Sequence, residues 1–216
     1  MDVCDIFHQV AVERAVKGAI DETIKDRKEH VVTVCKDSRI YSETGDTNMI
    51  NGKILEKLYN SCNREVSLHL HTHPHDTGYP SMSDITADAF YKPEHDCIWG
   101  EKDNKIYCYK AKGELAELGE KKRKLYDEWD ELQKINYESL TRTEKEKYTQ
   151  QFIDIRERIG DLRNKQDNLI IKEYSQYTPK ITVTRSNPFI GRYIDIYEPN
   201  CPLDNILPGL ASPMER

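Results

Sequence analysis

The feature that most constrains this chain is a pair of histidines, His71 and His73, that follows a stretch of alternating apolar residues. Val66, Leu68 and Leu70 recur at every second position, which is the period of a β-strand with one buried face. Side chains two residues apart on a strand point to the same face, so both imidazoles can converge on one ion. The sequence therefore predicts a strand that ends in two candidate metal ligands.

A turn and a helix are expected to follow this strand. Pro74 and the turn-forming residues after it end the strand, and Ser81 or Ser83 then caps a new helix. Asp84 falls in the first turn of that helix, where the helix dipole favours a carboxylate. Two imidazoles and one carboxylate suit zinc, with a fourth position left open for water.

The spacing of these residues resembles the signature of the JAMM family of zinc metalloproteases, also called MPN-plus or JAB domains. The matching residues are His71, His73 and Pro74, followed after a short turn by Ser81 and Asp84. The resemblance implies one zinc ion per chain, held by the two histidines and Asp84, with Ser81 hydrogen-bonding the oxyanion of a tetrahedral intermediate. It also implies hydrolysis of an isopeptide or peptide bond at the C-terminus of ubiquitin or a ubiquitin-like protein.

A glutamate upstream of the histidines completes the site of this family. Four candidates precede the strand, namely Glu13, Glu22, Glu29 and Glu43. Glu29 stands 42 residues before His71 and directly ahead of a hydrophobic strand, where the family places this residue. We select Glu29 as the general acid/base that takes a proton from the zinc-activated water and passes it to the leaving nitrogen. Glu22 and Glu43 are the alternatives.

Other residues near the motif have simpler explanations. Asp84 also fits an ordinary helix start, a role that is compatible with metal binding. If Asp84 is not a ligand, Asp88, one turn later, is the alternative ligand. His75 lies beyond the turn and is not expected to bind the metal. His69 is assigned to packing or to support of the metal ligands, and Trp99 to the core.

The remaining periodicities predict the fold. Apolar residues at helical spacing indicate helices at 5–26, 49–61 and 81–92, and alternation indicates strand pairs at 31–45 and 97–110. Ile181 and Val183 predict one late strand and residues 193–197 another, around a turn at 187–191. The resemblance implies an α/β fold of the MPN/JAB (cytidine-deaminase-like) type, with a central mixed sheet flanked by helices.

Residues 113–172 differ in character, because apolar residues recur at heptad-like spacings in two highly charged segments. Thr141 and Glu144 form a capping-box pattern at the start of the second segment. This predicts an inserted antiparallel helical hairpin, either a self-contained strut or an arm that binds a protein partner or a second copy. The predicted parts of the chain are a metalloprotease domain (1–112 and 178–200), an insertion (113–177) and a proline-rich C-terminal tail (201–216).

The composition limits the classes of partner and compartment. The net charge of −6 argues against a nucleic-acid surface, and no apolar run approaches the roughly 20 residues of a membrane span. The N-terminus lacks the pattern of a signal peptide. The six cysteines are scattered without a Cys-x-x-Cys pair, which predicts buried free thiols in a reducing compartment and hence a cytoplasmic protein.

Two other functions are compatible with the sequence. One is that of a RadC-like JAB protein linked to DNA metabolism, which the net acidity disfavours. The other is an assembly scaffold that acts through the helical hairpin, which the complete set of ligands disfavours.

Overall fold

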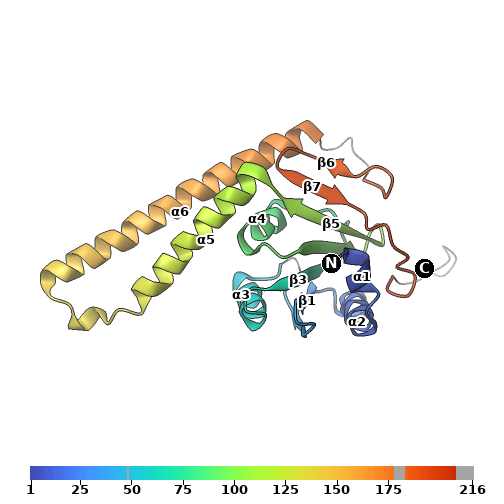
Figure 1. The fold of residues 1–216 in the computed structure, drawn as a ribbon, viewed down its shortest axis with the longest axis horizontal. Helices are drawn as coiled ribbons and strands as arrows, with labels where there is room; N and C mark the ends of the chain where they lie inside the picture. The colour runs from blue at the N-terminus through green and yellow to red at the C-terminus, as the bar shows by residue number, and fades with distance from the viewer. Residues whose placement is uncertain (48, 178–182, 208–216) are drawn as a thin grey trace.

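The structure, a computed structural model, describes residues 1–47, 49–177 and 183–207, which form a mixed sheet of seven strands with helices around it (Figure 1). The strand order is β2-β1-β3-β4-β5-β7-β6. β3 and β4 run parallel, and the other neighbouring pairs are antiparallel. The predicted α/β class, with a mixed sheet flanked by helices, is confirmed. The strands are β1 (His30–Cys35), β2 (Ile40–Thr44), β3 (Val66–His73), β4 (His95–Gly100), β5 (Lys105–Ala111), β6 (Phe189–Ile190) and β7 (Ile194–Tyr197).

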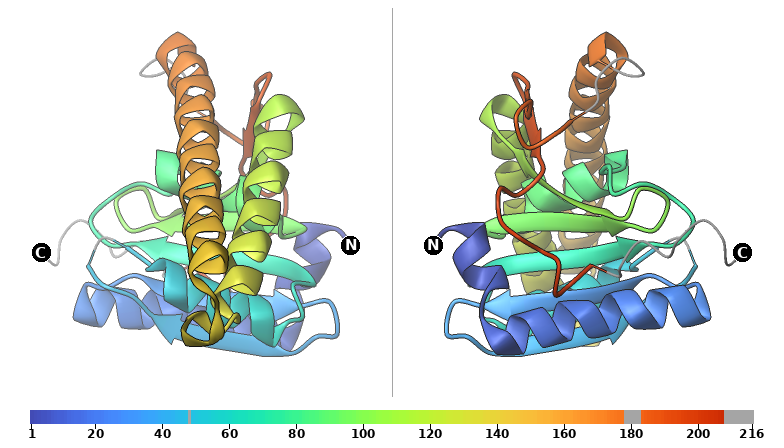
Figure 2. Two further views of the ribbon diagram at one scale, coloured as in Figure 1. Left: turned by 90° about the vertical axis from the view of Figure 1, so that its left-hand side faces the viewer. Right: turned by 90° about the vertical axis from the view of Figure 1, so that its right-hand side faces the viewer.

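Helices cover both faces of the sheet (Figure 2). On one face, apolar residues of α1 and α2 pack with Leu68 and Trp99 in the largest core cluster, which confirms the assignment of Trp99 to the core. On the other face, Ile85 of α4 and Leu115 of α5 pack together against the strands. The helices of the sheet domain are α1 (Val3–Phe7), α2 (Val10–Asp26), α3 (Gly52–Ser61) and α4 (Met82–Tyr91), and α5 (Gly113–Gln133) begins beside them.

The single helix predicted at 5–26 is wrong, because the chain forms two helices there. α1 ends at Phe7, and Gln9 is extended before α2 begins. The break turns Val10 outward, so that it is 70% exposed, whereas Ile6, four residues earlier, is fully buried. A continuous helix would have placed both residues on one face.

The predicted strand pairs are confirmed near the N-terminus and at β4–β5. β1 pairs with β2, and β4 pairs with β5, in the expected antiparallel hairpins. The C-terminal prediction is wrong in part, since Phe189 and Ile190, assigned to a turn, form β6, and Val183 lies outside any strand. Ile181 lies outside the described residues.

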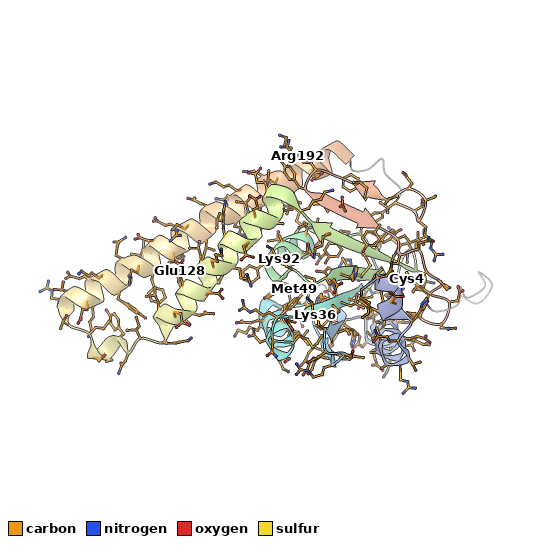
Figure 3. The ribbon with its side chains drawn as sticks, in the orientation of Figure 1. Cys4, Lys36, Met49, Lys92, Glu128 and Arg192 are labelled. Atoms are coloured by element: carbon orange, nitrogen blue, oxygen red, sulfur yellow. A yellow bond between two sulfur atoms is a disulfide. The ribbon has the colours of Figure 1, made fainter. Side chains whose placement is uncertain are left out.

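Two long helices separate β5 from the last strands. α5 is followed by a short 3-10 helix (Tyr137–Ser139) and by α6 (Arg142–Tyr177). Trp129 stacks edge-on against Phe152, and Tyr148 donates a hydrogen bond to the carbonyl of Leu132, so α5 and α6 pack antiparallel. Between them, Glu128 pairs with Arg158 at 3.7 Å (Figure 3).

The start of α6 has a helix cap. The amide of Thr141 donates to Glu144 and the amide of Glu144 to the Thr141 hydroxyl, which confirms the predicted capping box.

At its other end, the pair of α5 and α6 connects to the sheet. Lys92, at the end of α4, pairs with Glu120 of α5 at 3.0 Å (Figure 3). After α6, β7 pairs with β5, so the chain returns to the sheet that it left.

The six cysteines form three disulfides, so the prediction of free thiols is wrong. The pairs are Cys4–Cys201, Cys35–Cys62 and Cys97–Cys108. Disulfides persist mainly in oxidising compartments or in disulfide-rich hyperthermophile cells, so the cysteines do not support a reducing compartment. No described helix is long and apolar enough to cross a membrane.

The first of these disulfides secures the C-terminal segment. Cys201, Leu203 and Ile206 are buried in the same cluster as α1 and α2. Part of the predicted proline-rich tail is therefore packed against the sheet domain, while residues 208–216 lie outside the described residues.

Candidate metal centre

The two histidines of the motif lie at the end of β3, as the alternating pattern predicts. β3 is flanked by β1 and β4, and His71 pairs in register with Val31 of β1 and with Ile98 of β4. His71 is 5% exposed, and the side chain of His73 is 13% exposed. The strand therefore presents two rigidly held imidazoles between the interior and the surface.

The carboxylate of the motif comes from the first turn of α4. Ser81 caps this helix, accepting from the amide of Asp84, while Asp84 accepts from the amide of Ser81 at 2.7 Å. This reciprocal pair fixes the orientation of the Asp84 carboxylate. The predicted helix start is confirmed, and it serves at the same time to aim Asp84 at the histidines.

The three side chains meet at distances that suit a metal ion. Nε2 of His71 lies 3.2 Å from Nε2 of His73 and 3.3 Å from Oδ1 of Asp84, and Nε2 of His73 lies 3.6 Å from Oδ2 of Asp84. A tetrahedral zinc ion with bonds of about 2.0–2.1 Å keeps its ligand atoms roughly 3.3–3.4 Å apart. The three residues could therefore hold a metal ion, and two imidazoles with one carboxylate are a donor set that suits zinc.

Burial and neighbouring charges shift the pKa values of these three side chains in different directions. Burial lowers the pKa of His71, but the charge and hydrogen bond of Asp84 outweigh it and raise that pKa to about 9. Burial opposes ionisation of Asp84 as well, yet its pKa is held below the usual range, mainly by His71. Burial and the charge of His71 lower the pKa of His73. These shifts favour an ion pair between His71 and Asp84 and a neutral imidazole at His73.

Zinc binding is expected to release about one proton at pH 7.5. His71 is protonated below its pKa of about 9, and its Nε2 must lose that proton to bind metal. The apparent zinc affinity should rise by about tenfold per pH unit until this pKa is reached. Titration calorimetry in two buffers of different ionisation enthalpy measures the released protons. Zinc binding without proton release at pH 7.5 would contradict the ion pair between His71 and Asp84.

Glu29 is the upstream glutamate whose pKa is influenced by His71 and Asp84. It is 6% exposed and directly precedes β1, the neighbour of β3. Burial raises its pKa to about 7, the charge of His71 acts against this shift, and the charge of Asp84 adds to it. A carboxyl whose pKa lies near neutrality is suited to accept and return a proton.

The alternative glutamates make surface contacts. Glu22 approaches Lys25 one turn later on α2, and Glu43 pairs with Lys57 of α3. Glu13 lies in the first turn of α2. Of the four glutamates, Glu29 is the one that is among the main influences on the pKa of His71.

Of the other residues considered from the sequence, His75 and Asp88 do not belong to the group of three ligands, whereas His69 lies beside His71 with ring centroids 6.0 Å apart. The side chain of His75 is 67% exposed and lies 3.5 Å from Glu101. Asp88 is buried and accepts from the amide of Ala111, so it supports the junction of α4 and β5. His69 is buried and hydrogen-bonds the hydroxyl of Thr33 at 3.1 Å.

The sequence did not reveal a second acidic group behind the site. Asp96 of β4 is 2% exposed and forms, with His69 and His71, another cluster that could hold a metal. All three of its members are buried, whereas His73 and Asp84 are partly exposed. A catalytic metal must reach water and substrate, so the group of His71, His73 and Asp84 is the better site. The sequence predicts this strand only from residue 97, whereas β4 begins at His95 and includes Asp96.

Comparison with models of known protein families and with curated proteins finds no match for this chain. The functional assignment therefore depends on the signature residues and on the geometry that brings them together.

Proposed function

We propose that this protein is a JAMM-type zinc hydrolase that cleaves an isopeptide or peptide bond. The observation that supports this most directly is that the Nε2 atoms of His71 and His73 lie 3.2 Å apart and each lies 3.3–3.6 Å from one of the two carboxylate oxygens of Asp84. The MPN/JAB fold, with α5 and α6 as an insertion, is part of the same proposal. The substrate bond proposed is the one at the C-terminus of ubiquitin or a ubiquitin-like protein.

Different residues of the chain have different roles in amide hydrolysis. A zinc ion bound by the three ligands would supply Lewis acidity and lower the pKa of a water molecule towards about 7. Glu29 takes the proton from that water and delivers it to the leaving nitrogen. The exposed hydroxyl of Ser81 donates a hydrogen bond to the carbonyl oxygen of the substrate as negative charge develops on it.

The test of this function is the zinc content of the purified wild type beside that of His73→Ala. We expect about one zinc per chain in the wild type and its loss in the variant, because two ligands do not retain the ion. His75→Ala, a change at an exposed histidine outside the group, should keep its zinc. Absence of zinc from the wild type, even after zinc is supplied, would refute the proposed hydrolase and favour the scaffold alternative.

Ser81 should matter more for activity than for stability. Loss of one oxyanion donor lowers kcat by about 10²–10³-fold, whereas loss of a helix cap costs about 1 kcal/mol of folding free energy. Ser81→Ala should therefore be nearly inactive at temperatures where it is still folded. Ser83→Ala is the matched control, because its hydroxyl lies 2.7 Å from that of Ser81 but does not cap the helix. An equal loss of activity in both variants would contradict the role of Ser81.

Substrate turnover can be followed with ubiquitin-like fusion proteins. The location of the protein in the cell should be tested as well. A cytoplasmic location stays a prediction, and the three disulfides do not support it.

A further inference from the structure

A groove of about 1240 Å³ lies next to the candidate metal centre, between α3, α4, α5 and α6. It begins at Met82 and Ser83 in the first turn of α4. The hydroxyl of Ser83 is 2.7 Å from that of Ser81, so the groove starts beside the proposed catalytic residues. In Figure 1, α5 and α6 lead away from the sheet above α3. A segment bound in this groove would therefore lie next to Ser81.

One wall of the groove is aromatic. Phe90 and Tyr91 of α4 line it together with Tyr126 and Trp129 of α5. Phe90 meets Tyr126 edge-on with ring centroids 5.5 Å apart, and Tyr126 remains 42% exposed. Such half-open aromatic surfaces supply contact area at low cost in side-chain entropy, as in many protein interfaces.

Three basic residues, Lys122, Arg156 and Arg163, also line the groove, and the ammonium group of Lys122 lies 5.7 Å from the centre of the Phe90 ring. Lys122 is 8% exposed, and its ammonium group bonds the amide oxygen of Gln166 at 2.7 Å. Arg156 and Arg163 lie two turns apart on α6 and line the same groove. Within the described residues these three cations form no ion pair, whereas Arg123 and Arg158 on the same helices do.

Lys122 lies at the buried side of the groove, next to Gln166, which is fully buried behind the lining. Burial, followed by the charge of Arg163, lowers the pKa of Lys122 to about 8, and Asp167 acts in the opposite direction. A carboxylate bound in the groove would relieve the repulsion between Lys122 and Arg163.

The charge of the groove differs in sign from that of the whole chain. Five lysines and arginines line it against three acidic residues, whereas the chain has a net charge of −6. The acidic residues are Glu56, Asp130 and Asp167, and they are spread over α3, α5 and α6. This mixture opposes a continuous phosphate backbone, but it suits a polypeptide in which acidic side chains are interspersed with others.

We propose that this groove binds a segment of the protein substrate that contains acidic residues among apolar ones, and leads it to the metal centre. The acidic side chains lie against Lys122, Arg156 and Arg163, and the apolar ones lie against the aromatic wall. The inference rests on the proposed hydrolase function for the identity of the occupant, and it names the class of sequence that the enzyme recognises.

The experiment selects binders from a random library of 12-residue peptides on the zinc-loaded full-length protein, and then measures their affinity by fluorescence anisotropy. We expect an excess of Asp and Glu next to aromatic or aliphatic residues in the selected peptides. Arg163→Glu and Arg156→Glu should each lower the affinity at least about tenfold. Lys165→Glu is the matched control, because Lys165 is an exposed cation of α6 outside the groove, and its affinity should stay within about twofold.

His73→Ala separates this proposal from the proposed function. It should lose zinc but bind the selected peptides as the wild type does, so a missing zinc site and a missing peptide site give different results. Selected peptides without an acidic excess, or equal binding by Arg163→Glu and the wild type, would overturn the proposal. Tighter binding of a 12-residue oligothymidylate, or dimerisation that blocks the peptides, would overturn it in favour of nucleic acid or a second copy.

Discussion

Glu29→Gln is expected to lower amide hydrolysis by about 10²–10⁴-fold while the zinc content stays at the wild-type level. Glutamine has the size and polarity of glutamate, but it cannot accept a proton from water or return one to the leaving nitrogen. Glu29 is not among the three proposed ligands, so the metal should remain. The measurements are turnover of a ubiquitin-like fusion substrate and zinc per chain on the same preparation.

Glu22→Gln and Glu43→Gln provide the controls for this experiment. Both residues approach lysines at the surface, Glu22 on α2 and Glu43 on β2. Their activity should remain within about twofold of the wild type, since exposed ion pairs contribute little. Full activity in Glu29→Gln, or a large loss in either control, would show that the proton carrier has been misassigned.

Removal of the Cys4–Cys201 disulfide is expected to destabilise the protein by about 5 kcal/mol. The bond joins residues 197 positions apart, so it removes more freedom from the unfolded chain than the other two disulfides. Such a loss is comparable to the entire stability of many domains. Urea unfolding of Cys4→Ala/Cys201→Ala, compared with the wild type under non-reducing conditions, measures the change.

The double variant Cys35→Ala/Cys62→Ala is the internal comparison. Its loop spans 27 positions, for which the same relation gives about 3.5 kcal/mol. The metal ligands lie outside both pairs, so a folded variant should still bind zinc. If the shorter loop proved to be the more stabilising one, native-state contacts rather than chain entropy would account for the effect.

The sequence predicted the local part of the candidate site well. The two-residue period of β3 places His71 and His73 on one face, because alternation of side chains is a property of every strand. Ser81 and Asp84 form the capping box within a single turn, and this local hydrogen bonding also aims the carboxylate. These features depend on neighbours within a few residues, so the order of residues is enough to predict them.

Features that depend on distant pairing could not be predicted in the same way. Four glutamates precede the histidines, and only the pairing of β1 with β3 decides that Glu29 is the buried one beside them. The cysteines show no local pattern, because the partners are brought together by folding across as many as 197 positions. The break between α1 and α2 likewise depends on which apolar residues the sheet can accept.

The sequence by itself determined the histidine pair, the helix start with Asp84, and the α/β succession of elements, because hydrogen bonding and side-chain period act along the chain. The tertiary structure alone decided which glutamate is buried near the ligands, how the cysteines pair, and that Asp96 lies behind His71. It also decided that Lys122, Arg163 and Phe90 line one groove. Burial and electrostatic environment arise only when segments distant in sequence pack together. Both therefore depend on the tertiary structure, and they determine which side chains are candidates for catalysis and binding.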